Sequence, residues 1–311
     1  MHTLGSRGLQ TPRSETFWND VSIAGNVSSA TVAANGCLCG ARISLPVRLG
    51  LRSRIRPMLE GRWCCGEKCL RARVTSIVRR EFVRNRPQQA HRHRVPLGLL
   101  LLTSHAITEA QLHAAVQRAK TTQRRLSEVL VAEFGLSQQK LAEARARQWG
   151  CGSWDVRGTL PDGMAAIAPR AVLEAARMLP LRIFSGGQLA VAFDEGLDAQ
   201  ATLALQRIHH CQVESGIAAP DEFLQAARRL SNQRSVAVEE VVCDSTKDAV
   251  RQMVRIFEKQ APVESRWARV HDVFWLRLWL EPAALAGGIS QVEDVKDYIF
   301  PLHDIPDEQK S

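Results

Sequence analysis

The sequence predicts an α+β fold: a tandem repeat of helical pairs, then a small ββαβα subdomain, then a second small α+β segment at the C-terminus. Three observations support this order. Residues 96–119 and 125–148 carry the same apolar pattern. Two alternating apolar runs flank a glycine turn within 180–194, as in a β-hairpin. A further set of strand-like runs, rich in tryptophan, surrounds residue 275.

Charge is distributed unevenly along the 311 residues, whose net formal charge is +9. Residues 1–94 contain 17 Arg and Lys against 5 Asp and Glu, a net +12, so the remaining residues carry −3. The basic part shows little periodicity, and Gly, Ser and Pro interrupt its apolar runs. We therefore expect residues 1–93 to be a disordered basic leader, or upstream sequence translated from a start codon placed too early.

The same basic part has two other interpretations, which we rank lower. An arginine-rich segment can bind nucleic acid electrostatically, but this one has few aromatic side chains for stacking and no recognisable module. Its composition is superficially that of a transit peptide. No nucleic-acid partner is predicted.

The eight cysteines predict neither a disulfide framework nor a metal site. Three stand alone in apolar surroundings and are expected to be buried thiols in a reducing cytoplasm, namely Cys151, Cys211 and Cys243. The others form two clusters, Cys37 with Cys39, and Cys64 and Cys65 with Cys69. Zinc sites commonly pair their ligands as C-x2-C, whereas these spacings are C-x-C and C-C-x3-C. The spacing therefore predicts no metal ligand.

Each copy of the repeat is expected to form a short apolar helix, a turn and a longer capped helix. In the first copy, Thr108 is a good N-cap and Gln111 follows three residues later, the pattern of a capping box. In the second copy Ser137 is the expected N-cap. Because neither helical pair can bury its apolar face alone, we expect the two pairs to pack on each other around a small core.

The repeat resembles a known tandem motif, R-L-G-x-x-aliphatic-aliphatic-x-x-G-aliphatic-aliphatic-x4-L-x3-L-x2-Q. This motif belongs to the N-terminal domain, often called the MshEN domain, of bacterial type II secretion and type IV pilus assembly ATPases. The first copy keeps Leu97, Gly98, Leu101, Leu102, Ile107 and Leu112. The second keeps Arg125, Leu126, Leu130, Val131, Leu136, Leu141 and Gln148. The resemblance extends to about Leu230.

Some members of this family bind cyclic di-GMP through the motif, whose arginine, glycines and leucines line the nucleotide. The resemblance therefore implies tentative nucleotide contacts from Leu97, Gly98, Arg125, Leu126 and Gln148. Other motif positions differ: Pro96 replaces an arginine, His105, Ser127 and Phe134 replace glycines, Ala119 replaces a glutamine, and Arg145 replaces a leucine. Packing positions are kept while ligand positions change, which favours a retained fold over retained nucleotide binding. For Arg124 and Arg125, a solvated arginine pair at a helix start is the simpler interpretation.

The remainder of the predicted 94–230 domain has a ββαβα order, similar to the second half of the same family domain. After a loop at 149–160 and a helix at 170–177, a hairpin at 180–194 turns at Ser185, Gly186 and Gly187. A helix at 198–209, a strand at 212–218 and a helix beginning at Pro220 follow. The glycine pair lacks the lysine and the spacing of a phosphate-binding loop.

Residues 231–311 are predicted to form a second small α+β domain. Strands are expected at 236–242, 263–270 and 273–280, with an edge strand at 298–302, and a helix that Ser245 caps. Four aromatic side chains are expected to build its core, namely Trp267, Phe274, Trp275 and Trp279.

No catalytic constellation is present, and the protein is predicted not to be an enzyme. The ATPases of the family carry a P-loop, acidic metal-binding boxes and a zinc tetracysteine motif after the N-terminal domain, and none of these occurs in residues 231–311. His209 and His210 are expected to be solvated at a helix end, and His271 lies in a predicted turn with Asp272.

The resemblance implies a non-catalytic protein-interaction or regulatory module related to type II secretion or type IV pilus assembly. In the family this domain docks the motor to an inner-membrane assembly protein, so we expect a protein partner from such a machine. No apolar run approaches the roughly 18–20 residues that span a bilayer. We expect a cytoplasmic location, or a peripheral one at the inner membrane through that partner. The alternative function is a cyclic di-GMP receptor with a degenerate tandem motif; no cofactor or metal is predicted.

Overall fold

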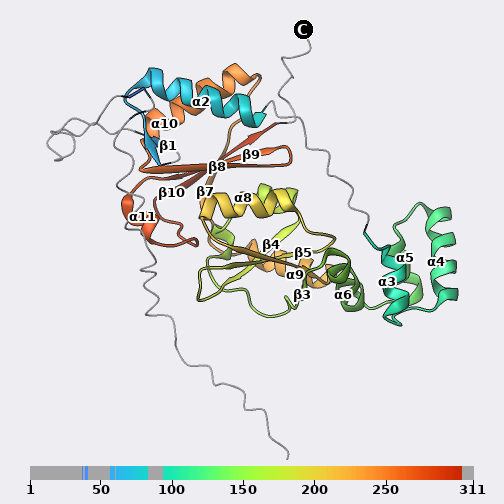
Figure 1. The fold of residues 1–311 in the computed structure, drawn as a ribbon. Coiled ribbons are helices and arrows are strands. Elements are labelled where there is room, and N and C mark those ends of the chain that lie inside the picture. The colour runs from blue at the N-terminus through green and yellow to red at the C-terminus, as the bar shows by residue number, and fades with distance from the viewer. Residues whose placement is uncertain (1–36, 38, 41–56, 60, 83–93, 303–311) are drawn as a thin grey trace, which may run out of the picture. The chain divides into compact units, whose positions relative to one another are not determined.

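The computed structural model describes residues 37, 39–40, 57–59, 61–82 and 94–302, and it combines α-helices with β-sheets (Figure 1). Within these residues the strands form a two-stranded hairpin and two four-stranded sheets. No helix of this part of the chain is long and apolar enough to cross a membrane.

The repeat region consists of α3 (Leu97–Thr103), α4 (Glu109–Thr122), α5 (Leu126–Phe134) and α6 (Gln138–Trp149). Thr108 and Gln111 form the predicted capping box, and Ser137 caps α6 by accepting a hydrogen bond from the Lys140 amide. Helix α3 packs against α6, and α4 packs against α5. The core between them consists of Leu101, Ile107, Ala115, Val129, Leu130, Leu136, Leu141 and Ala144.

The sheet that follows the repeat has the order β3-β6-β5-β4. Its strands are β3 (Gly152–Trp154), β4 (Met178–Ile183), β5 (Leu189–Phe193) and β6 (Val213–Ala218). Its helical segments are the 3-10 helix η1 (Met164–Ala166), α7 (Arg170–Ala175), α8 (Ala199–His209) and α9 (Pro220–Leu230). Strands β4 and β5 form the predicted hairpin, whose turn Gly187 closes with φ of 76°. The loop predicted at 149–160 contains β3, because this backbone pairs in parallel with Gly216–Ala218.

The second large sheet has the order β7-β10-β9-β8. Its strands are β7 (Ala237–Glu240), β8 (Glu264–Val270), β9 (Val273–Trp279) and β10 (Val295–Pro301), and its helices are α10 (Thr246–Gln260) and α11 (Pro282–Ala286). The prediction of an edge strand at 298–302 is wrong, because β10 lies inside the sheet. It pairs in parallel with β7 and antiparallel with β9. A strand with partners on both sides is apolar on most positions, and β10 is buried over Tyr298–Phe300.

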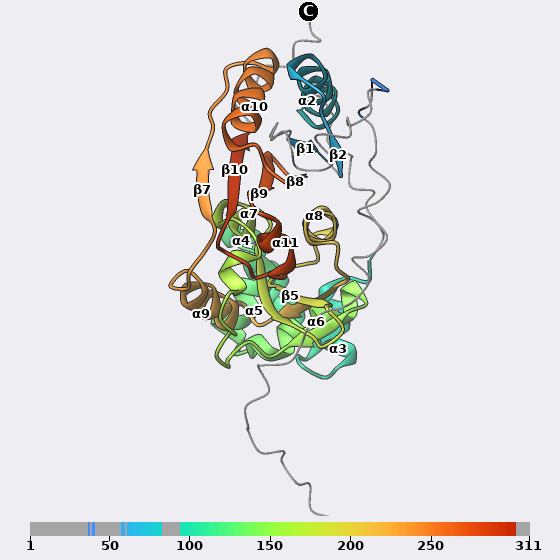
Figure 2. The ribbon, with the colours of Figure 1, turned by 90° about the vertical axis from the view of Figure 1, so that its left-hand side faces the viewer.

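The predicted leader contains ordered elements that pack on the second sheet. These are β1 (Met58–Leu59), β2 (Arg62–Trp63) and α2 (Glu67–Phe82). Helix α2 lies beside α10 on one face of the sheet, and α8 lies on the opposite face (Figures 1 and 2). The leader prediction is therefore wrong for this part. Leu70, Val74, Ile77 and Val78 do recur at helical spacing and are buried, but surrounding arginines conceal the pattern. The rest of 1–93 lies outside the described residues.

One hydrophobic core crosses the predicted boundary between residues 230 and 231. Leu205 and Ile208 of α8 belong to the same cluster as Val270 of β8 and Trp275 of β9. A second cluster joins α2 and α10 to the other face of the same sheet. Because α8 contacts both β6 and β8, the ββαβα part and the second sheet share their packing.

Candidate ligand site on the tandem repeat

Three of the five predicted nucleotide-contacting residues serve the packing of the repeat. Leu97 and Leu126 begin α3 and α5 and pack, partly buried, against the core of the repeat. Gly98 is buried, and a Cβ atom at this position would lie 2.9 Å from Cδ1 of Leu112. Gly98 therefore permits the close contact between α3 and the Leu112 side chain of α4. This packing accounts for a glycine at position 98 with no ligand present.

Gln148, at the end of α6, holds the chain segment that leads into α3. Its Nε2 donates a hydrogen bond to the carbonyl oxygen of Val95 at 2.7 Å. The adjacent Trp149 carries the Arg94 guanidinium 3.3 Å from its ring centroid. The Trp149 indole also lies against Gly196, where a Cβ atom would be 2.3 Å from Cζ2 of the ring. The end of α6 thus contacts both the start of the repeat and the segment after β5.

Arg125 is bound to that same segment. Its Nη1 donates to Oε1 of Glu195, in an ion pair whose side chains are 65% and 40% exposed. An anionic ligand that bound Arg125 through Nη1 would have to displace Glu195 from this ion pair. The neighbouring Arg124 pairs instead with Glu133, at 3.1 Å, on the surface of the repeat.

Two departures from the family motif contact each other. Arg145, in place of a leucine, donates through Nη2 to Oγ of Ser127, which replaces a glycine, at 3.3 Å. The Nη1 of Arg145 donates to the main-chain oxygen of Asp194 at 2.7 Å. Burial lowers the pKa of Arg145, which nevertheless remains charged because an arginine pKa starts far above neutrality. The charged side chain therefore links both helices of the second copy to the end of β5.

Asp194 completes the network from the sheet side. Its carboxylate is buried and binds Arg177 through two hydrogen bonds, one of 3.0 Å from Nε to Oδ1. The hydrogen bond with Asp194 raises the pKa of Arg177. Residues 194–196 are thus the common neighbour of Arg125, Arg145, Arg177 and Trp149. Arg125, Arg145 and Arg177 therefore each already donate to an oxygen atom of the protein itself.

The turns after the short helices differ from the expectation for the second motif glycine. In the first copy His105 occupies the left-handed region, with φ of 53°. In the second copy the left-handed residue is Gly135, with φ of 68°, and not Phe134, which still belongs to α5. The turn glycine is therefore present one residue later than predicted. Phe134 packs, partly buried, on the core of the repeat.

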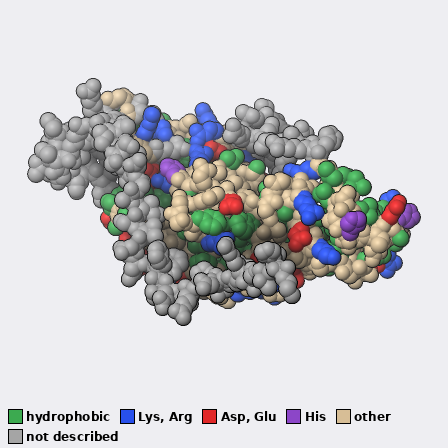
Figure 3. Space-filling view, turned by 60° about the horizontal axis from the view of Figure 1, so that its bottom comes forward, with side chains coloured by type: hydrophobic (Ala, Val, Ile, Leu, Met, Phe, Trp, Pro, Cys, Tyr) green, Lys and Arg blue, Asp and Glu red, His purple; other side chains and the backbone are tan. Residues whose placement is uncertain are grey.

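Side chains of both charges are interspersed with apolar ones over the surface of the repeat region, at the right of Figure 3. The two exposed apolar side chains next to the predicted contacts are Val95 and Leu99, with 53% and 50% of their surface accessible. Among the arginines of the repeat, Arg118, Arg124 and Arg125 each pair with a glutamate.

A cavity of about 430 Å³ lies apart from the predicted contacts. Helices α7 and α9 and strands β4 and β7 line it, with apolar side chains such as Leu173, Phe223 and Val238. Arg177 connects the two places, since it lines this cavity and also binds Asp194. None of the five predicted residues lines it.

The histidines considered as metal or nucleophile candidates have structural partners. His209 is buried, and its Nε2 lies 2.7 Å from the carbonyl oxygen of Ile167. Burial lowers the pKa of His209 to about 3, so the ring is neutral at physiological pH. The prediction of a solvated His209 is wrong, because the last turn of α8 faces the core. His271 contacts Asp198, the N-cap of α8.

Four cysteines converge although their spacing did not predict it. The Sγ atoms of Cys37, Cys39, Cys65 and Cys69 all lie within 4.8 Å of one another. The expectation that the two clusters form no joint ligand set rested on spacing alone, whereas the structure brings the four sulfur atoms together.

No family model and no curated protein matches this chain. Among solved structures, it is similar to a structure of MshE with cdg (cyclic di-GMP), at 27% sequence identity and a TM-score of 0.37. That match covers 44% of this chain and 99% of the MshE chain. It is also similar to the N-terminal domain of XpsE, at 20% identity and a TM-score of 0.32, over 43% of this chain and 92% of that one.

Proposed function

We propose that this protein is a non-catalytic interaction module of a type II secretion or type IV pilus assembly machine. The tandem repeat serves in it as a folded docking unit. The proposal rests on the resemblance of the two motif copies. The observation that carries it is the contrast between the packing positions of the motif and its ligand positions. The packing positions Leu101, Leu130, Leu136 and Leu141 are buried together, whereas the retained Arg125 pairs with Glu195.

The partner we propose is the cytoplasmic segment of an inner-membrane assembly protein, which is the family's docking partner. Helices α3 to α6 offer a rigid surface for such a contact, because both pairs are capped and share one core. A module of this kind needs no catalytic residue.

The second candidate function is a cyclic di-GMP receptor. Arg125, Leu126 and Gln148 match the motif, and the Arg125 side chain is 65% exposed. MshE, one of the similar solved structures, is described with cyclic di-GMP. Against this candidate, the first copy has Pro96 where the motif has its arginine. Each lost charge-assisted hydrogen bond is worth roughly 1.5–3 kcal/mol. An arginine fork can make two such contacts, so losing both weakens binding by about two to four decades.

Binding to the assembly protein tests the proposal. The full chain would be titrated with the purified cytoplasmic segment of the assembly protein, with and without cyclic di-GMP. We expect saturable binding with the same affinity in both cases. Arg125→Ala and the matched control Arg124→Ala should both retain that affinity, because each removes a surface ion pair. Absence of binding, or binding only with the nucleotide present, would contradict the proposal.

A further inference from the structure

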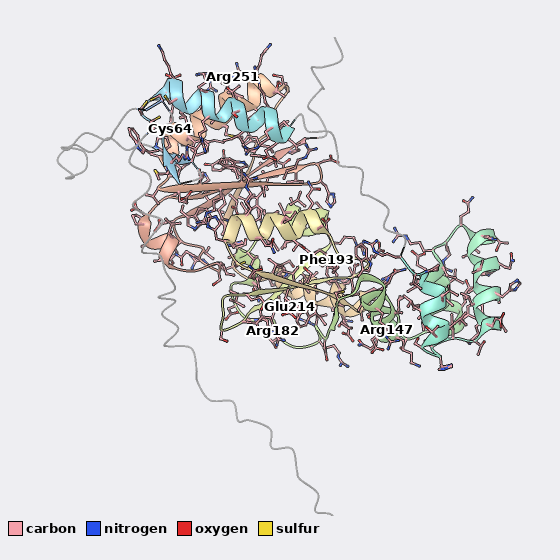
Figure 4. All side chains as sticks on the ribbon, viewed as in Figure 1. Cys64, Arg147, Arg182, Phe193, Glu214 and Arg251 are labelled. Atoms are coloured by element: carbon pink, nitrogen blue, oxygen red, sulfur yellow. The ribbon has the colours of Figure 1, made fainter. Side chains whose placement is uncertain are left out.

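Two cysteine pairs from distant parts of the sequence meet at the N-terminal end of α2. The Sγ of Cys65 lies 3.3 Å from that of Cys39 and 3.3 Å from that of Cys69. With Cys37, these are the four sulfur atoms that lie within 4.8 Å of one another. Figure 4 shows sulfur atoms, drawn in yellow, at this end of α2 near the label of Cys64.

Each pair is held by defined local structure. The β1–β2 hairpin turns at Gly61, with φ of 69°, and delivers Cys65 to the start of α2, whose first turn carries Cys69. Cys37 and Cys39 lie in a turn in which the Gly40 amide donates to the Cys37 carbonyl oxygen at 2.9 Å. Gly40 has φ of 81°, which favours glycine. The two pairs are therefore presented by a turn and by a helix start.

The distances fit a single tetrahedral ion. Zinc binds thiolate sulfur at about 2.3 Å, so neighbouring sulfurs of a tetrahedral Cys₄ site lie about 3.8 Å apart. The observed separations of 3.3 Å to at most 4.8 Å bracket that value. All four sulfurs lie within 4.8 Å of one another, whereas a cluster of several iron atoms would need its ligands spread further apart. The set suits one thiophilic cation.

The surroundings suit the negative charge of four thiolates on one divalent ion. The N-terminus of the sixteen-residue α2 directs its partial positive charge at Cys65 and Cys69. The Cys65 amide donates to Sγ of Cys37 at 3.4 Å, a hydrogen bond that stabilises a thiolate ligand. Lys68 and Arg71 follow on the same helix. Glu67, the nearest acidic residue of the helix, is paired with Arg71 at 2.8 Å.

We propose that Cys37, Cys39, Cys65 and Cys69 bind one zinc ion in a structural site. Four cysteine ligands complete the tetrahedral coordination, so no position is open for a water or substrate. Cys64 is not a ligand, because its side chain is buried in the core with Leu70 and Val74. Cys39 is exposed, which gives the ion a path from solvent.

The site would fix the position of α2 on the second sheet. Helix α2 packs beside α10, and its buried side chains join Met253, Phe257 and Trp267 in one core. The ion links the turn at Cys37 and Cys39 to the end of this helix. Because a structural zinc site binds only the folded arrangement, its binding free energy adds to the stability of the α2 layer.

Metal content and cobalt spectroscopy test this proposal on the full chain, purified under reducing conditions without chelators or a histidine tag. We expect one zinc ion per chain by elemental mass spectrometry. Cobalt exchanged into the protein should show the ligand-field bands of a tetrahedral site and thiolate charge transfer of an intensity that counts four sulfurs. The double variant Cys39→Ser, Cys65→Ser should lose both signals. Cys211→Ser, a half-buried cysteine outside the cluster, is the matched control and should keep them.

Several results would overturn the proposal: no zinc and no cobalt spectrum in the reduced protein, metal retained by the double variant, or a disulfide among these cysteines in its place. If the double variant fails to fold, the cobalt spectrum of the unmodified chain decides. Charge transfer from fewer than four thiolates would then rule out the site. Chelation of zinc should also lower the melting temperature of the unmodified chain and leave that of a folded double variant unchanged.

Discussion

Arg277 of β9 and Asp297 of β10 form a buried ion pair, for which a loss of stability on mutation can be calculated. Arg277 donates to both carboxylate oxygens, at 2.8 and 2.6 Å, and Trp275 donates to Oδ1 at 2.8 Å. Arg277 also donates to the carbonyl oxygen of Ala166, in η1, at 2.8 Å. The two charged residues are at most 1% exposed. The pair therefore connects the second sheet to the ββαβα part through the shared core.

Asp297→Asn should destabilise the protein by about 3–5 kcal/mol, because it leaves the Arg277 guanidinium buried without its counter-charge. That loss is a large share of the roughly 5–15 kcal/mol by which folded domains are stable. Replacing both partners by apolar residues, Arg277→Met with Asp297→Leu, should cost less than the single change, since no charge is then left unpaired. By contrast, removing the exposed Arg125–Glu195 pair should cost about 0–1 kcal/mol.

Urea unfolding followed by tryptophan fluorescence measures these differences. If the shared core makes the ββαβα part and the second sheet unfold together, fluorescence and far-UV circular dichroism should give one coincident transition. A loss below about 1 kcal/mol for Asp297→Asn would refute the reasoning from burial. So would a double variant less stable than the single one, or a separate transition for each part.

Two further predictions concern stability. Gly216→Ala should destabilise by about 1–3 kcal/mol, because its Cβ would lie 2.7 Å from the carbonyl oxygen of Gly152; Gly158→Ala, with no atom within 4 Å, is the control. Urea midpoints compare the two, and equal midpoints would contradict the close approach of β3 and β6. His209 should make stability fall as pH falls. Burial holds its folded pKa at about 3, so below the unfolded value of 6.5 only the unfolded chain takes up this proton. The free energy of unfolding should fall by about 2 kcal/mol between pH 7 and pH 5, and His209→Gln should reduce that loss. If the variant keeps the same pH profile, His209 is not the cause of the loss.

The elements with strong local signals were predicted from sequence. The capping box of Thr108 and Gln111, the caps Ser137 and Ser245, and the hairpin closed at Gly187 all depend on residues a few positions apart. The long-range arrangements were missed. Strand β10 was misjudged as an edge, because its second partner, β7, lies more than fifty residues earlier in the chain.

At the candidate sites, sequence reasoning failed where side chains from separate elements compensate each other. Arg145 and Ser127 were interpreted as two independent losses from the motif, whereas they hydrogen bond to each other and, through Asp194, to the sheet. The cysteine set was dismissed because spacing rules describe ligand pairs within one local segment. Cys39 and Cys65 lie 26 positions apart in the sequence, yet their Sγ atoms are 3.3 Å apart. No local pattern contains either arrangement.

Calorimetric titration of the full chain with cyclic di-GMP tests the central claim most directly, because it asks whether the tandem motif still binds a nucleotide. We predict weak binding or none, with the same result for Arg125→Ala and for the control Arg124→Ala. The Arg125 guanidinium is already paired with Glu195, and Pro96 supplies no second arginine. Binding in the low-micromolar range or tighter, abolished by Arg125→Ala and kept by Arg124→Ala, would contradict the account and make the protein a nucleotide sensor.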